Sequence, residues 1–238
     1  MSRGLSQSGI TKYRDCPYAF YLHYKCNCEP MFYDTEAMDV GGIGHKSIEF
    51  YYKNHFSTDT NPEEILYYTY DKMKSLWDTS FSIENYQKIY RCLENHAIWE
   101  YQNISNGQTN KPIIEKKMNH CGYFGIADYI YLPKRKVIDF KTNKYASVSY
   151  NYRMQAYVYK VLFENEFDTK LKDYYLYFLY PNEWRKISYE KENQKKVGLE
   201  TEILKNKILN GEFPKKPRYP TMCRNCEYKY YCFLTSKK

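Results

Sequence analysis

Hydrophobic and polar positions change their period near the middle of the chain. Before residue 106, apolar and aromatic residues recur mostly at helical spacing, and after residue 111 they alternate or run together as they do in strands. The first half predicts helices over residues 8–24, from about 44 through 52, over 62–79 and over 82–105. Pro17 predicts a kink or break in the first of these, and Asn61 followed by Pro62 predicts the start of the third. The Asn106-Gly107 turn predicts the end of this helical half.

Strands dominate the second half of the chain. They are predicted over residues 112–118, 123–132, 136–142, 174–180 and 184–189, with helices over 149–163 and 190–210. Gly211 is placed to end the last helix. Helices before and between the strands predict an α/β fold in which a mixed central sheet is flanked by helices.

The stretch from Gly125 to Asn143 carries charge where a pair of strands is expected. Its two apolar runs are separated by PKRK at 133–136, which predicts a hairpin. Side chains alternate along a strand, so Asp139 and Lys141 share one face, and pairing across the hairpin brings Asp128 toward Asp139. Like charges at that separation repel each other unless a cation lies between them. A bound metal ion meets that requirement; the alternative is an exposed hairpin whose charges face water.

Composition limits the classes of protein to consider. The 238 residues are enough for one sizeable domain, and 43% of them are hydrophobic, so a disordered chain is excluded. No long apolar span occurs, which excludes a membrane-spanning protein. The formal charge of +8 favours a polyanionic partner such as nucleic acid. The 30 tyrosines fit base stacking, but an AT-rich coding sequence accounts for them as well.

The N-terminal residues and the cysteines indicate a reducing compartment. The segment MSRGLSQSGITKY at 1–13 lacks the apolar core of a signal peptide, so a cytoplasmic location is expected. Eight cysteines in such a compartment predict metal or cluster ligands before disulfides.

Four short motifs follow one another in an order that resembles a known family. They are GxxxH at Gly41–His45, GxxD at Gly125–Asp128, DxK at Asp139–Lys141 and QxxxY at Gln155–Tyr159. Each motif alone is unspecific, but each falls on the helix or strand where that family has it. Together they resemble the PD-(D/E)XK nuclease superfamily, in its RecB-like branch. The resemblance implies a restriction-endonuclease-like core with a mixed central sheet, flanking helices and a helical insertion.

The same resemblance implies a role for each motif residue. His45, Asp128, Asp139 and the carbonyl of Phe140 are expected to bind a divalent metal ion, Lys141 to act as the catalytic lysine, and Gln155 and Tyr159 to position DNA and the active site. Carboxylate oxygens suit Mg²⁺, and a histidine nitrogen suits Mn²⁺ somewhat better. Lys141 would orient the nucleophile and offset phosphate charge. Glu49, one helical turn after His45, is expected to be a partner of that histidine or an extra acid. The plain alternatives are a hydrogen-bonded histidine at a helix start and a core aromatic at Tyr159.

A second set of residues places cysteines at both ends of the chain. Cys16 lies in CPYAF near the start, and Cys223, Cys226 and Cys232 form C-x2-C-x5-C near the end. With their neighbours, LSQSGITKYRDCPYAF and GEFPKKPRYPTMCRNC, they resemble iron–sulfur nucleases of the AddB type and of the Cas-four family of CRISPR adaptation. That resemblance implies a [4Fe–4S] cluster joining the two ends, a restraint of about 4 kcal/mol or more by loop-closure arithmetic. Zn²⁺ at the four cysteines is the alternative, and Cys26 or Cys28 is an alternative ligand to Cys16.

The resemblance spans nearly the whole chain and implies one nuclease domain over residues 1–238. Within it, 1–40 would carry the N-terminal cluster ligand, 41–110 the helical part with His45, 111–190 the catalytic sheet and the QxxxY helix, and 191–238 the last helix and the cysteine cluster. The expected activity is that of a metal-dependent DNA exonuclease on single-stranded or frayed ends. The expected polarity is 5′-to-3′, leaving 5′-phosphate and 3′-hydroxyl ends.

Two biological settings fit this activity. One is CRISPR adaptation beside an integrase complex, and the other is recombination and repair in a phage or mobile element. No GxxxxGK[ST] motif occurs, so a separate helicase or ends that are already open are expected as partners. The alternative from another class is a non-catalytic iron–sulfur or zinc DNA-binding subunit of a larger nuclease or integration complex. The intact Asp128, Asp139 and Lys141 argue against that alternative.

Overall fold

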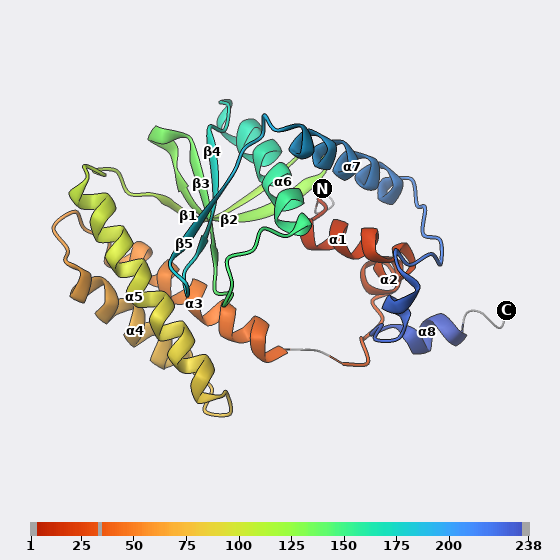
Figure 1. Ribbon diagram of the computed structural model, residues 1–238, viewed down its shortest axis with the longest axis horizontal. Helices are drawn as coiled ribbons and strands as arrows, with labels where there is room; N and C mark the ends of the chain where they lie inside the picture. Colours follow the sequence, from red (N-terminus) through yellow and green to blue (C-terminus); the bar gives the residue numbers. More distant parts are fainter. Residues whose placement is uncertain (1–3, 33–34, 235–238) are drawn as a thin grey trace.

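The computed structural model describes residues 4–32 and 35–234 and confirms the predicted α/β architecture (Figure 1). Its helices are α1 (Gln7–Asp15), α2 (Pro17–Tyr24), α3 (Thr35–Asn54), α4 (Pro62–Leu76), α5 (Ile83–Ser105), α6 (Tyr150–Phe167), α7 (Glu192–Leu209) and α8 (Lys229–Leu234), with 3-10 turns η1 (Leu132–Lys134) and η2 (Pro220–Cys223). Its strands are β1 (Ile113–His120), β2 (Tyr123–Tyr131), β3 (Lys136–Lys141), β4 (Asp173–Phe178) and β5 (Glu183–Ile187). Residues 1–3, 33 and 34 of the predicted N-terminal segment and 235–238 of the predicted cysteine segment lie outside the described residues.

The five strands form one mixed sheet in the order β1-β2-β3-β4-β5. Neighbouring strands are antiparallel except β3 and β4, which run parallel and are joined through α6. A parallel pair needs a long crossover connection, and the helix supplies it. The crossover places α6 over the sheet, close to the charged end of β3.

Helices cover both faces of the sheet, so β2 and β3 are buried along most of their length. On one face, α1, α6 and α7 pack over a core that includes Ile10, Leu162 and Val197. On the other face, α3, α4 and α5 pack over a second core that includes Phe140 and Tyr129. Figure 1 shows these two helical layers on opposite sides of the strands.

Local signals in the sequence fix most helix ends. Asn61 caps α4 in a capping box with Glu64, and Ser149 caps α6 by accepting from the Tyr152 amide. The predicted break at Pro17 is found, because α1 ends before Cys16 and α2 begins at Pro17. The predicted start of the second helix at Gly44 was wrong: α3 begins at Thr35 and carries its glycines inside the helix. Glycine is a weak helix former, and packing against the sheet outweighs its cost.

The C-terminal segment folds back onto the N-terminal helices. The Arg218 amide donates to the carbonyl of Asp15 at 2.8 Å, and the Met31 amide donates to the carbonyl of Glu227 at 3.0 Å. Tyr228 is fully buried in a small core of its own with residues of α2. The lobe formed by α1, α2, η2 and α8 lies at the right of Figure 1, beyond α6. None of the described helices combines the length and the hydropathy needed to cross a membrane.

Candidate active site

The predicted hairpin exists and places Asp128 against β3. Tyr129 pairs with Ile138, and continuing that antiparallel register would set Asp128 opposite Asp139. The ladder stops there, and the Asp128 carboxylate accepts the Phe140 amide at 2.7 Å instead. A side chain thus replaces a strand partner, which holds this carboxylate in a fixed position.

Asp139 and Lys141 lie on one face of β3, as the alternation of side chains predicts. The Lys141 ammonium is 2.5 Å from Asp139 Oδ2, and Gln155 on α6 donates from Nε2 to Asp139 Oδ1 at 2.9 Å. Lys141 also donates to Gln155 Oε1 at 3.2 Å. These three side chains form a closed triangle that joins β3 to α6.

A second group of side chains faces Asp128 from two other elements. His45 on α3 places Nδ1 at 3.4 Å from Asp128 Oδ1 and at 3.9 Å from Glu115 Oε1 on β1. One ligand atom from each of the three residues lies within 4.8 Å of the others. Among residues 4–32 and 35–234, this is the one group of three or more His, Cys, Asp and Glu side chains with such spacing.

Glu115 was missed from the sequence. It lies between Ile114, which pairs with Tyr129, and Lys116, which pairs with Ala127, so it stands beside Asp128 across β1 and β2. Its backbone adopts φ +50°, a left-handed conformation that is uncommon for a residue with a side chain. Such conformations concentrate at functional sites. The sequence did offer one signal, an acidic residue in the strand segment IIEKK. It did not show which strand pairs with that segment.

The carboxylates and the histidine shift each other's protonation. Burial lowers the pKa of His45, but the carboxylates of Asp128, Asp139 and Glu115 together outweigh burial and raise it to about 9. Burial favours neutral Asp128, yet the His45 imidazolium and Lys141 hold the pKa of Asp128 below its usual value. Burial, with Asp128 nearby, raises the pKa of Glu115 to about 7. Without a bound cation, a proton within the His45–Glu115–Asp128 group therefore offsets the repulsion between its carboxylates.

The Asp139–Lys141 pair is balanced differently. Burial raises the pKa of Asp139 to about 6, although the Lys141 ammonium opposes that rise. Burial disfavours charged Lys141, but Asp139 and Asp128 outweigh it and raise the pKa of Lys141. Lys141 is therefore a cation at neutral pH, beside the acidic group.

This donor set suits a divalent cation of the Mg²⁺ or Mn²⁺ type. Two carboxylates and one imidazole offer oxygen and nitrogen ligands, and acids as close as Glu115 and Asp128 repel each other unless a cation or a proton lies between them. Of the four predicted ligands, His45 and Asp128 belong to this group. Asp139 lies beside it, bound to Lys141 and Gln155, and Phe140 contributes its amide to Asp128.

Tyr159 lies one turn beyond Gln155 on α6, with its side chain buried against β2. Its hydroxyl donates to the carbonyl of Ile126. Gly125 allows this approach, since a Cβ there would stand 3.1 Å from the Tyr159 ring and 2.8 Å from Leu162 Cδ1. The structure thus brings the predicted Gln155 and Tyr159 to one face, where Gln155 contacts the acid and Tyr159 anchors the helix to the strand.

The four predicted cluster cysteines lie in the lobe formed by α1, α2, η2 and α8. Cys16, Cys223, Cys226 and Cys232 line one pocket of about 500 Å³. Burial raises the pKa of Cys16 and of Cys226, and neighbouring cysteines of the set add to both shifts. Within the described residues, no three cysteine sulfurs lie within 4.8 Å of one another, so they are not gathered as ligands of one metal ion. Cys26 and Cys28 do not line the pocket.

Comparison with known proteins is consistent with this site. Residues 4–233 match the model of the PD-(D/E)XK nuclease superfamily. A solved structure described as "Crystal structure of SSO0001" aligns over 80% of this chain and 94% of that chain, with 17% sequence identity and a TM-score of 0.36, a likeness too low to carry an argument. No curated protein matches the chain. Since the family match runs through every element from α1 to α8, the chain belongs to the PD-(D/E)XK nuclease superfamily.

Proposed function

We propose that this protein is a metal-dependent DNA exonuclease that acts on single-stranded or frayed ends. One observation carries the proposal: the Asp139–Lys141–Gln155 triangle stands directly beside the His45–Glu115–Asp128 group. A cation-binding group and a buried ammonium, side by side, are what phosphodiester hydrolysis requires.

Each side chain has a defined task in this proposal. His45, Asp128 and Glu115 hold the divalent ion, with Asp139 and the Phe140 carbonyl as the further ligands expected from the motif. When bound, Mg²⁺ or Mn²⁺ supplies a Lewis acid for the phosphate oxygen and lowers the pKa of water.

Lys141 offsets the charge that develops on the phosphate, and Gln155 holds the Lys141 ammonium and the Asp139 carboxylate in register. In-line attack of water then gives 5′-phosphate and 3′-hydroxyl ends. We assign the entire chain, residues 1–238, to this one nuclease domain.

The motif order and the cysteines support the RecB-like branch with iron–sulfur members of the Cas-four and AddB type. We propose 5′-to-3′ polarity from that likeness. The cell would supply open ends through a separate helicase, or an integrase complex would present them during CRISPR adaptation. A phage or mobile-element recombination pathway is the other setting, and the genes beside this one distinguish the two.

Cys16, Cys223, Cys226 and Cys232 are proposed to bind a [4Fe–4S] cluster. Each thiolate of such a cluster binds a different iron, so the sulfurs lie farther apart than around one Zn²⁺ ion. Four cysteines that line one pocket without the spacing of a single-ion site fit that requirement. The cluster would hold the C-terminal segment against α1 and α2.

The nuclease proposal is tested with single-stranded DNA and Mn²⁺. Asp139→Ala and Lys141→Ala should each abolish most hydrolysis, since they remove the two charges of the triangle. Asp71→Ala and Lys74→Ala are matched controls, because this pair, 3.3 Å apart, lies exposed on α4. Equal digestion by the parent and by both active-site variants would contradict the proposal. Binding without hydrolysis by the parent would favour a non-catalytic DNA-binding subunit.

The cluster proposal is tested by anaerobic purification and analysis of bound iron and sulfide. Cys16→Ser and Cys226→Ser should lose most of the iron, whereas Cys121→Ser, an exposed thiol outside the pocket, should keep it. If the parent contains zinc and no iron, the four cysteines form a zinc site and the cluster proposal is wrong. If iron is retained in Cys16→Ser and lost in Cys28→Ser, the fourth ligand is Cys28 rather than Cys16.

A further inference from the structure

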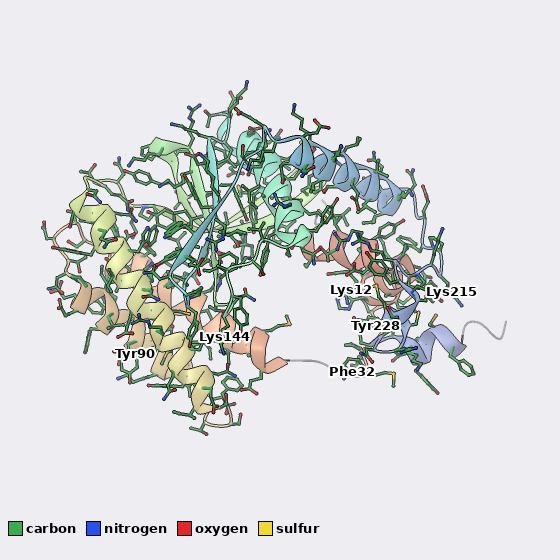
Figure 2. All side chains as sticks on the ribbon, viewed as in Figure 1. Lys12, Phe32, Tyr90, Lys144, Lys215 and Tyr228 are labelled. Atoms are coloured by element: carbon green, nitrogen blue, oxygen red, sulfur yellow. The ribbon has the colours of Figure 1, made fainter. Side chains whose placement is uncertain are left out.

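A pocket of about 690 Å³ begins at the Asp139–Lys141–Gln155 triangle, the catalytic triangle of the proposed function, and leads away from it. Lys141, Tyr152 and Gln155 line its inner end. From there it runs along α1 to the C-terminal segment, which carries Asn225 and Glu227. Figure 2 shows Lys12, which lines the pocket, in the same lobe as Tyr228 of the C-terminal segment. This pocket, named the α1 pocket, leads from Lys141 and Gln155 to the place where two parts of the chain that are distant in sequence meet.

The walls of the α1 pocket are nearly neutral. The protein carries a formal charge of +8, but the lysines and carboxylates that line this pocket are Lys12, Lys141, Asp15 and Glu227, two of each sign. The cysteines in its walls are the proposed cluster ligands Cys16, Cys223 and Cys226, which add no positive charge. Lys12 is 2.6 Å from Glu227 Oε1, and Lys141 is 2.5 Å from Asp139 Oδ2. Both lysines are therefore already paired with carboxylates, and the excess positive charge of the protein lies elsewhere.

Two neutral hydrogen-bond donors in the pocket walls have no acceptor among the described residues. Asn151 accepts from Arg14 at its Oδ1, 2.8 Å away, so its amide nitrogen is the free end. Thr11 accepts from Gln7 Nε2 at 2.7 Å, so its hydroxyl proton has to point elsewhere. Within residues 4–32 and 35–234, no protein acceptor takes a hydrogen bond from either group. Both residues line the α1 pocket.

We propose that the α1 pocket holds one strand of DNA on its way to or from the catalytic triangle, and that Asn151 and Thr11 bind its phosphates as neutral donors. This inference rests on the proposed nuclease function and adds to it the path and the means of binding. A pocket of this volume takes a ligand of about one or two nucleotides. That volume leaves no room for the second strand of a duplex.

The first test is the salt dependence of binding. A short fluorescent oligothymidylate is titrated with the full-length protein in EDTA, which prevents hydrolysis, and anisotropy is read at several salt concentrations. For single strands, the logarithm of the association constant falls by about 0.7 per neutralised phosphate for each unit in the logarithm of salt concentration. Neutral donors neutralise no phosphate, so a pocket with paired lysines should give a slope shallower than about −0.7. A slope steeper than about −0.7 would show that cations hold the strand and would overturn the inference.

The second test removes the neutral donors. Asn151→Asp keeps the acceptor for Arg14 but loses the amide nitrogen, and Thr11→Val keeps the branched shape but loses the hydroxyl. Each variant should bind the oligothymidylate about tenfold more weakly, the loss expected for a hydrogen bond to a charged group. Asn206→Asp, on the exposed face of α7, is the matched control for added charge and should bind as the parent does. Parental affinity in both pocket variants, with unchanged melting temperature, would overturn the inference.

A parallel assay separates this inference from the proposed function. The same oligothymidylate is incubated with the parent and Mn²⁺. Hydrolysis combined with a steep salt slope would leave the nuclease standing and remove the α1 pocket from the strand path. No hydrolysis combined with weakened binding in both variants would support the α1 pocket as a strand-binding site and contradict the nuclease function.

Discussion

Gln155 donates a hydrogen bond of 2.9 Å to Asp139, sixteen positions earlier in the chain. The same amide accepts from Lys141, so it can satisfy both partners only in one orientation, with Nε2 toward the acid and Oε1 toward the ammonium. This contact joins the crossover helix to the strand that it follows. The geometry of the acid–lysine pair thus depends on the position of α6.

The first prediction concerns this amide. Gln155→Leu should lower the rate of single-strand hydrolysis by about 10- to 100-fold, because Asp139 and Lys141 lose the group that orients them. The rate constant at saturating DNA should fall more than the apparent affinity. Gln87→Leu, an exposed glutamine on α5, is the control. A rate within twofold of the parent would mean that the acid–lysine pair orients itself.

Glu115 provides the second prediction. Glu115→Gln should weaken Mn²⁺ binding by about tenfold or more, because it removes one of the three protein ligands around the candidate cation site. Isothermal titration or the EPR signal of free Mn²⁺ measures this without DNA. Glu63→Gln is the matched control, since Glu63 lies exposed in the first turn of α4. Equal loss in both variants would indicate a general effect of negative charge rather than ligation.

Gly125 provides the third prediction. Gly125→Ala should lower the free energy of unfolding by about 1–3 kcal/mol, because the new methyl would meet Leu162 at 2.8 Å and the Tyr159 ring at 3.1 Å. Gly42→Ala meets nothing within 4 Å in α3 and should raise that free energy by about 0.5–1 kcal/mol. Urea unfolding of the two variants compares them directly. If Gly125→Ala is neutral, Tyr159 and α6 move more freely than the packing indicates.

Local patterns were enough to predict the hairpin and most of the elements, although not the first turns of α3 or the short helix α8. The alternation that put Asp139 and Lys141 on one face is a property of a single strand, and their 2.5 Å contact follows from it. Similarly, the cap at Asn61 and the break at Pro17 depend only on neighbouring residues. Such short-range features are encoded within a few positions, so the sequence reveals them.

Features that depend on distant pairing could not be predicted in the same way. Glu115 meets His45 and Asp128 only because β1 lies beside β2 and α3 crosses their ends, and no motif marks it. The ligand role of Asp139 stays a prediction, since this carboxylate contacts Lys141 and Gln155. The α1 pocket likewise arises where two ends of the chain meet.

The last prediction concerns a buried acid on α5 and the pH dependence of the free energy of unfolding. Glu100 on α5 is fully buried, and burial raises its pKa to about 7, although the nearby Tyr52 hydroxyl and a hydrogen bond from Gln108 oppose the rise. Its pKa in the unfolded chain is about 4.3, so between these values the folded protein binds the extra proton. As far as this group is concerned, stability should therefore be greatest at or below about pH 4, and should fall by up to about 4 kcal/mol as pH rises through 7.

Glu100→Gln should remove this loss, because a neutral amide does not ionise. The variant should match the parent near pH 4 and exceed its free energy of unfolding near pH 8, measured by urea titration at both values. Glu84→Gln, on the exposed first turn of the same helix, should leave the pH dependence as it is. A parent whose stability does not fall over this range would mean that Glu100 is ionised in the folded protein, held by its hydrogen bonds in spite of burial.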